Sequence, residues 1–433
     1  MKNSIFLKST IILLIGGIIT KLLGMIIKIL MSRLLGTEGI GLYMLITPTF
    51  MLLITISQLG FPMALSKFVA EDTKNNKNLV FSLIPVSIII NIFIIFLLLL
   101  CSRFISISLL KDQRLYYPIL FIGLVIPFTT ISSILRSYFF GKQKMMPHVI
   151  SNIIEDIIRL VLLAIGIPIF IKYGLEKAIS FIIISNIISE LASILILFLF
   201  LPKSFKITKK DLKPNKQYIK DSLYLGIPNT LGKLIGTIGY FLEPIILTFS
   251  LLLNGYTNKY IIYEYGIISG YVMPLLLLPS FFSLAISQAL LPTVSKNSIN
   301  KNYKYIRKKI RQAVILGFLI GLVFTCIIYI YPEFFLKTLY NTKEGIPYLR
   351  ILAPICLFQY IQAPLAFTLD GLGKSKITMI STLLGTITRC IILLIGPFLK
   401  LGIYSLIISI GLNILVVTLY QIKEVTKIIN NKI

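Results

Sequence analysis

The sequence contains no tryptophan, only one histidine and only four cysteines. The cysteines lie in or beside apolar runs, and neither they nor His148 have the spacing of zinc ligands or of a disulfide framework. The chain also lacks the cluster of neighbouring acid, base and nucleophile candidates that an enzyme requires. We therefore expect no metal, no cofactor and no catalytic residues.

Acidic residues are scarce, because 16 Asp and Glu stand against 43 Lys and Arg, which gives a formal net charge of +27. Charged residues make up 14% of the chain and hydrophobic residues 56%, whereas soluble proteins contain about 25% charged residues. This composition excludes an ordinary soluble fold. Basic loops beside membrane spans account for the positive charge, so we expect no nucleic-acid partner.

Long apolar runs dominate the 433 residues. A membrane-spanning helix needs about 20 mostly apolar residues, and about twelve such stretches can be recognised. We place them at residues 10–31, 42–60, 80–100, 117–139, 149–171, 178–201, 223–251, 267–291, 313–335, 349–369, 377–399 and 402–420. The gaps between them average about 13 residues, too short for an independent domain of about 50 or more. The sequence predicts a multi-pass, all-α integral membrane protein.

The distribution of basic residues predicts the orientation of these spans. With the N-terminus inside, roughly 27 basic residues fall in inner loops and roughly 11 in outer loops, and this bias sets membrane topology. The first stretch has no small-residue cleavage site, so we expect it to remain as a helix. We expect a protein of the cell membrane with both termini in the cytoplasm. The densest basic run, Lys296 to Arg311, is either a topology-setting loop or a basic amphipathic helix on anionic membrane lipids.

Polar, glycine and proline residues reveal an internal duplication at a spacing of about 230 residues. The pattern of Gly41, Ser57-Gln58, Pro62, Gly141-Lys142, Ser151, Arg159 and Gly166 recurs as Gly270, Ser287-Gln288, Pro292, Gly373-Lys374, Ser381, Arg389 and Gly396. Each half holds six spans, an even number, so both halves have the same orientation. We predict two six-helix lobes related by a parallel repeat, at residues 1–201 and 223–433, joined by a basic cytoplasmic linker at 202–222. Transporters built this way bind substrate between the halves, near the bilayer midplane.

Charged residues inside spans are functional candidates, because a charge at the helix centre costs about 2.5–3.5 kcal/mol on insertion scales. Lys21 and Lys28 are two helical turns apart and share one face of the first span. Together with Lys233, the counterpart of Lys21 in the second half, they could line a cavity that attracts an anion. An alternative for Lys28 is that its side chain reaches to the membrane interface.

The remaining intramembrane charges are candidates for a coupling-ion site, with H⁺ or Na⁺ as the ion. They are Glu155, Asp156, Arg159, Glu243 and Arg389. Glu155 and Arg159 have the spacing of an ion pair within one helix, which could be purely structural. Glu243 precedes Pro244, and a carboxylate beside a proline-broken helix could bind a cation, although a structural kink would also explain the proline.

Several segments carry a family resemblance. They are Thr20-Lys-Leu-Leu-Gly24, Arg33-Leu-Leu-Gly-Thr-Glu-Gly-Ile-Gly41, Gln58-Leu-Gly-Phe-Pro62, Tyr240-Phe-Leu-Glu-Pro244 and Ala289-Leu-Leu-Pro-Thr-Val-Ser-Lys296. In these segments the chain resembles the stage V sporulation protein B family, which stands with the polysaccharide and lipid II flippases in the multidrug/oligosaccharidyl-lipid/polysaccharide exporter superfamily. The similarity extends over essentially the whole chain. It does not specify one substrate.

The resemblance implies a two-lobed exporter that moves an undecaprenyl pyrophosphate-linked saccharide, a peptidoglycan precursor, to the outer leaflet by alternating access. Lipid II flippases carry arginine where Lys21 stands, and an Arg-Asp pair where this chain has Ile27-Lys28. Because lysine lacks the planar fork of arginine, the pyrophosphate would be bound differently.

Two other functions remain open. A cation-coupled multidrug antiporter on the same fold would need carboxylates in the cavity, since its substrates are cationic. A membrane-embedded glycosyltransferase would need acidic residues on large outer loops, and the predicted loops are short. The balance of Lys21, Lys28 and Lys233 against Glu243 favours the flippase.

Overall fold

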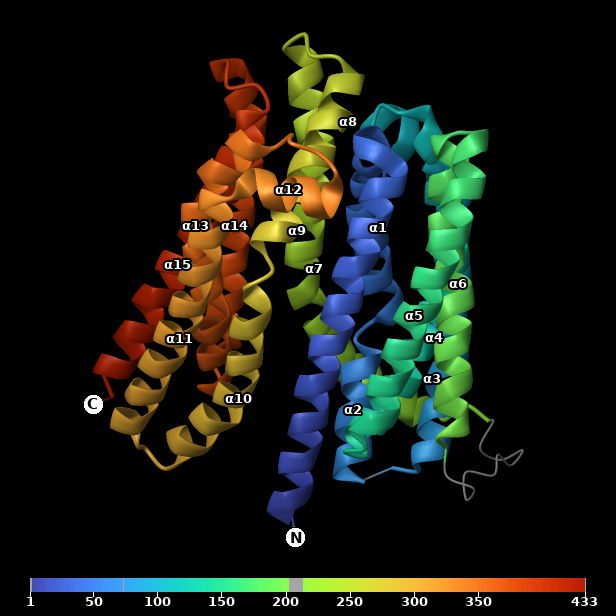
Figure 1. Ribbon diagram of the computed structural model, residues 1–433. Coiled ribbons are helices and arrows are strands. Elements are labelled where there is room, and N and C mark those ends of the chain that lie inside the picture. Colours follow the sequence, from blue (N-terminus) through green and yellow to red (C-terminus); the bar gives the residue numbers. More distant parts are fainter. Residues whose placement is uncertain (1, 73, 202–212, 433) are drawn as a thin grey trace. The chain divides into compact units, whose positions relative to one another are not determined.

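The computed structural model describes residues 2–72, 74–201 and 213–432. These ranges are almost entirely helical and contain no strand, so the predicted all-α class is confirmed (Figure 1). The first half contains α1 (Lys2–Gln58), α2 (Phe61–Glu71), α3 (Asn76–Arg103), α4 (Tyr116–Gly141), α5 (Met145–Phe170), α6 (Leu175–Leu199) and α7 (Lys216–Leu253). The second contains α8 (Asn258–Gly266), α9 (Met273–Leu276), α10 (Ser280–Ile299), α11 (Tyr303–Ile330), α12 (Pro332–Tyr340), α13 (Ile346–Gly371), α14 (Ser375–Ile395) and α15 (Tyr404–Asn430). Short π-helical and 3-10 turns extend several of these helices.

Nine helices in the described ranges are long and apolar enough to cross a membrane, or ten if the bent pair Asn258–Leu276 and Ser280–Ile299 forms one span. Two features account for the difference from the twelve predicted stretches. Helix α1 contains two of them, because Gly36 leaves the helical conformation at φ 68° and divides α1 into two segments. Helix α5, which contains the predicted span 149–171, carries three charged residues near its centre and for that reason is not among the nine.

The predicted span at residues 267–291 is interrupted by a bend. The chain bends by 52° at a turn, residues 277–279, that separates α9 from α10. Pro279 closes this turn. Proline has no N–H to donate and disfavours the helical conformation of the residue before it, so the helix ends here and a new one begins.

The chain forms two compact units, Met1–Thr237 and Ile238–Ile433, and the boundary lies inside α7. Most of the linker proposed at residues 202–222 falls at 202–212, outside the described residues, and its last part already belongs to α7. The first half of α7 packs on the first unit, where Lys74 forms an ion pair with Asp221. Its second half packs on α14, since the Ser250 hydroxyl donates to the Leu393 carbonyl (2.8 Å).

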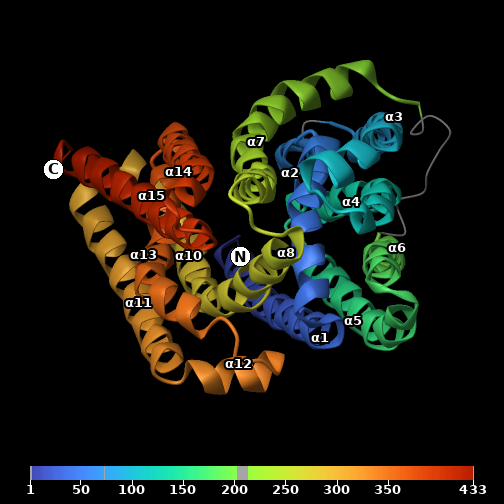
Figure 2. The same cartoon turned by 90° about the horizontal axis from the view of Figure 1, so that it is seen from above.

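The two units repeat one packing pattern. In the first, α4 packs against α2, α3 and α6, and α5 packs against α6 (Figure 2). In the second, α13 packs against α10, α11 and α15, and α14 packs against α15. Helices α4 and α13 therefore occupy corresponding central positions within their own units, as a duplication would produce.

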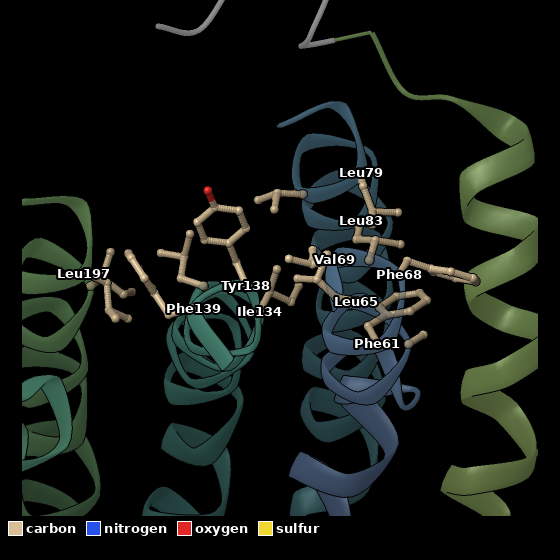
Figure 3. Packing of buried hydrophobic residues seen from close by; sticks show 14 residues of the cluster. Phe61, Leu65, Phe68, Val69, Leu79, Leu83, Ile134, Tyr138, Phe139 and Leu197 are labelled. Carbon is tan, nitrogen blue, oxygen red and sulfur yellow. The ribbon is translucent and has the colours of Figure 1, made fainter. Parts of the chain in front are cut away.

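Apolar side chains of α2, α3, α4 and α6 form a core in the first unit (Figure 3). The core continues to the end of α4, where a Cβ at Gly141 would collide with the Ser66 carbonyl oxygen and with Val69. Gly371 ends α13 against Leu291 and Val294, where a Cβ would make tight contacts of 3.0–3.1 Å. The two helix ends therefore pack in corresponding ways, and at Gly141 only a residue without a side chain fits.

The contacts also correct the register of the duplication around α10. Ser57 lies 3.1 Å from the Thr130 hydroxyl on α4. Tyr360 on α13 is the residue 230 positions after Thr130, and its carbonyl accepts a hydrogen bond from Ser283. Ser283, rather than Ser287, therefore occupies the place of Ser57, and the sequence match is displaced there by about one helical turn.

Candidate functional site

The first segment of α1 presents a stripe of lysine and glycine. Gly17, Lys21, Gly24 and Lys28 are spaced by four, three and four residues, so they share one face of the helix. Both lysines are exposed, and a Cβ added to either glycine would meet no atom within 4 Å. No neighbouring helix in the described ranges therefore packs against the two glycines of this stripe.

The opposite face of this segment is apolar. Ile15, Ile18, Leu22 and Ile26 are 54%, 39%, 55% and 47% exposed. At about 100° of rotation per residue they lie across the helix from the lysine stripe. The lysines thus point away from the exposed surface that suits lipid tails, which favours a polar site over an interfacial anchor for Lys28.

In the described part of the chain, neither of these two lysines is paired with a carboxylate. Among the ion pairs of the described residues, none includes Lys21 or Lys28. The two ammonium groups are near enough to repel each other, and Asp156 on α5 attracts Lys21 from beyond ion-pair distance. The stripe is consequently a local excess of positive charge.

Lys233 lies in a separate polar pocket of the same unit. The pocket has a volume of about 120 Å³ and is lined by Thr55, Gln58, Gly60, Pro62, Met63, Asn229, Thr230 and Lys233. Its walls meet where the backbones of Gly60 and Gly226 approach so closely that neither position has room for a Cβ. Gly60 also adopts φ 67°, which glycine accepts at little cost.

The pocket beside Lys233 is rich in hydrogen-bond donors. Gln58 and Asn229 contribute side-chain amides, and the Asn229 amide nitrogen is buried without a partner in the structure. No carboxylate lines the pocket, and Lys233 has no ion pair among the described residues. A buried amide without a partner is costly, so a ligand with acceptor oxygens would be stabilised here.

The structure brings Lys21 and Lys28 together but does not join them to Lys233. No hydrogen bond or ion pair among the described side chains connects the pocket to the stripe. The three lysines therefore form two cationic positions in the first unit, one on α1 and one on α7.

The charges of α5 form a buried network with α4 and α6. Arg136 contacts Glu155, lies 3.4 Å from Glu190, and donates to the Ser193 hydroxyl at 2.6 Å. Arg159 pairs with Glu155, as the spacing predicts, and lies 3.5 Å from Asp156. The side chains of Glu155 and Glu190 are 9% and 8% exposed, so these carboxylates depend on the arginines.

Two members of this network, Arg136 and Glu190, were not predicted from the sequence. Arg136 lies near the end of the predicted span 117–139 and was not among the predicted intramembrane charges. Glu190 lies in the middle of an apolar stretch and could have been recognised by the same criterion as Glu155.

In the second unit, Arg389 on α14 pairs with Glu243 on α7. The Tyr265 hydroxyl donates to the same carboxylate at 3.1 Å. Glu243 is 2% exposed, and the guanidinium already neutralises it. A cation could bind Glu243 only by displacing or supplementing Arg389.

The duplicated arginines obtain their partners in different ways. Arg159 and Arg389 are 230 residues apart, and Gly385 and Thr386 stand where the first unit has Glu155 and Asp156. The carboxylate that pairs with Arg389 therefore comes from another helix. Each unit retains a neutralised arginine, whereas the unpaired lysines on α1 and in the pocket belong to the first unit.

Comparisons with known proteins agree with this architecture. The profile of the polysaccharide biosynthesis protein family matches residues 6–298, and the MatE profile matches residues 268–395. The chain is 32% identical to stage V sporulation protein B of Bacillus subtilis, over 99% of this chain and 85% of that protein. It is 23% identical to the lipid II flippase MurJ of the same organism, over 90% of this chain and 77% of MurJ.

Among solved structures, the fold is similar to an inward-facing conformation of a multidrug resistance MATE family transporter of the MOP superfamily. The TM-score is 0.79 at 17% identity, and the match covers 98% of both chains. At this identity the match establishes the fold. Because the family profile covers more than half of the sequence and the likeness to the sporulation protein spans nearly all of it, the chain belongs to the polysaccharide biosynthesis protein family, within the MOP superfamily of flippases and transporters.

Proposed function

We propose that this protein is a flippase that moves an undecaprenyl pyrophosphate-linked saccharide, a peptidoglycan precursor, across the cytoplasmic membrane by alternating access. The observation that carries the proposal is the lysine stripe on α1. Lys21 and Lys28 are exposed, share one helix face with the unpacked Gly17 and Gly24, and lack an ion-pair partner among the described residues. Cations without counterions attract a polyanion such as a pyrophosphate.

The pocket beside Lys233 supports the saccharide part of the proposal. Its amides and hydroxyls can donate to the oxygens of a sugar, and Lys233 adds a charge for a phosphate. The pyrophosphate would bind the α1 stripe, while part of the headgroup would reach the pocket. Lysine forms single hydrogen bonds to phosphate rather than the paired bonds of arginine, so several lysines are needed for firm binding.

The proposal also includes location and coupling. The basic-loop bias supports a position in the cell membrane with both termini in the cytoplasm. We place the coupling ion, H⁺ or Na⁺, at one of the two arginine–carboxylate groups, Glu155–Asp156–Arg159 or Glu243–Arg389. There the ion would compete with a guanidinium for a carboxylate. We assign the protein no catalytic step of its own.

The cation-coupled multidrug antiporter is the second candidate, because the MATE-type fold is common to both activities. A cationic drug would be repelled by Lys21 and Lys28. The carboxylates that it would need are neutralised by Arg136, Arg159 and Arg389. The arrangement of charge therefore favours an anionic substrate.

The test is translocation of lipid II by purified protein in liposomes, measured beside efflux of a cationic dye. We expect translocation without dye efflux. Lys21→Ala, Lys28→Ala and Lys233→Ala should each weaken capture by roughly tenfold to a hundredfold, since each removes a charge-assisted hydrogen bond worth about 1.5–3 kcal/mol. Dye efflux without lipid II translocation would overturn the proposal in favour of the antiporter.

Two further variants sharpen the test. Lys28→Gln separates a headgroup ligand from an interfacial anchor, because only the ligand should lose activity when the charge is removed. Lys172→Ala removes an exposed lysine outside the proposed site and should behave like the unmodified protein. Insertion and yield of each variant are measured in parallel, so that a folding defect is not mistaken for a binding defect.

A further inference from the structure

An apolar groove opens between three helices of the second unit, with a volume of about 440 Å³. It is lined by Arg307, Ile310, Arg311 and Val314 of α11, Ile361 and Leu365 of α13, and Ile422, Val425, Thr426, Ile429 and Asn430 of α15. The volume lies in the range of about 300–1,000 Å³ that is typical of small-molecule sites. The groove is distant in sequence from the lysine stripe and from the pocket beside Lys233.

The groove has an apolar floor and a basic rim. Ile310, Ile361, Leu365 and Val425 are buried members of the apolar core of this unit. Arg307 and Arg311 are exposed, and they are four residues apart, so both lie on the groove side of α11. Neither takes part in an ion pair among the described residues. The groove therefore offers two unpaired guanidinium groups above an apolar channel.

This combination matches an amphiphile with an anionic head. The arginines lie in the first turns of α11, where the chain enters the membrane, and the apolar lining continues from there along the helix. Guanidinium groups bind phosphate oxygens through paired hydrogen bonds, and a basic pocket between spans is a typical site for a phospholipid headgroup. The sequence also places this end of α11 in the most basic loop of the chain, on the side predicted to be cytoplasmic.

We propose that this groove binds an anionic glycerophospholipid of the inner leaflet, with its phosphate on Arg307 and Arg311 and one acyl chain along Ile310, Val314 and Leu365. The bound lipid would hold α11, α13 and α15 together. Charge complementarity selects an anionic over a zwitterionic lipid, and the apolar floor selects a lipid over free phosphate. The site does not depend on which substrate the protein transports.

The experiment measures lipid retention by the full-length protein. Protein purified in mild detergent is exchanged into phosphatidylglycerol, phosphatidylcholine or diacylglycerol, and bound lipid is counted by native mass spectrometry. We expect the unmodified protein to retain phosphatidylglycerol selectively. The variant R307Q/R311Q should retain about tenfold less or lower, because two charge-assisted contacts are lost.

Two controls keep the proposal falsifiable. K304Q/K308Q removes two lysines with the same spacing on α11 that do not line the groove, and it should retain lipid normally. Ile422→Trp fills the groove without changing charge and should also reduce retention.

Three outcomes would overturn the proposal. Equal loss of bound lipid in R307Q/R311Q and K304Q/K308Q would show that retention depends only on the total positive charge of α11 and not on this groove. Displacement of phosphatidylglycerol by equimolar undecaprenyl phosphate would assign the groove to the carrier lipid instead. Inorganic phosphate that competes as well as lipid would reject the acyl-chain assignment.

Discussion

Removal of Arg389 should destabilise the protein more than removal of its partner Glu243. The Glu243 side chain is 2% exposed and would keep only the Tyr265 hydroxyl, whereas Arg389 is 23% exposed and can be partly rehydrated. Loss of one member of a buried pair typically costs about 3–5 kcal/mol. We therefore expect Arg389→Met to lie at the top of that range and Glu243→Gln below it.

The double variant E243Q/R389M gives the decisive comparison. It leaves no uncompensated charge, so it should be more stable than Arg389→Met alone, with a coupling free energy of about 2 kcal/mol or more. The assay is unfolding in mixed micelles of mild detergent and sodium dodecyl sulfate, followed by circular dichroism. The exposed pair of Lys343 and Glu333 serves as the control, and Lys343→Met should cost less than about 1 kcal/mol.

The reasoning would be refuted if the loss in the double variant equalled the sum of the two single losses. The guanidinium and the carboxylate would then contribute independently. Glu243 would then be a candidate site for a coupling cation that does not depend on Arg389.

Three further outcomes are expected. In a Cys-free background, a cysteine at Lys308 should resist an impermeant thiol reagent in intact cells while one at Asn254 reacts; the reverse labelling would invert the topology. Gly141→Ala should lower stability by about 1–3 kcal/mol, because a Cβ there collides with backbone, while Gly17→Ala, with open space around it, should not; equal melting temperatures would contradict the packing. Arg136→Met should cost about 3–5 kcal/mol, because it leaves the buried Glu190 without an ion-pair partner and Glu155 with Arg159 alone; an unchanged unfolding curve would show that Arg136 contributes no stability.

Much of the fold was predictable, because the apolar composition and the length of each stretch determine whether it crosses the membrane as a helix. The bend before α10 was harder, since prolines occur both in bent and in continuous helices. Pro279 ends a helix, whereas Pro292 lies inside one. The register of Ser57 and Ser283 depends on contacts with a third helix, which a comparison of two apolar segments does not contain.

The candidate site was predictable where it depends on one helix and unpredictable where it depends on packing. The shared face of Lys21 and Lys28 follows from helical periodicity alone. The pairing of Glu243 with Arg389 joins residues far apart in the sequence, so spacing could not indicate it. Arg136 lies near the end of its predicted span, where a charged side chain usually reaches water. Here, two carboxylates on neighbouring helices draw it inward.

The central claim is that unpaired lysines of the first unit bind the anionic headgroup of the transported lipid. The most direct measurement is lipid II translocation in liposomes by a well-inserted Lys21→Ala, Lys28→Ala double variant, compared with Lys21→Arg and with the unmodified protein. We predict that the double variant loses translocation and that Lys21→Arg, which keeps the charge, retains it. Normal translocation by the double variant would contradict the account.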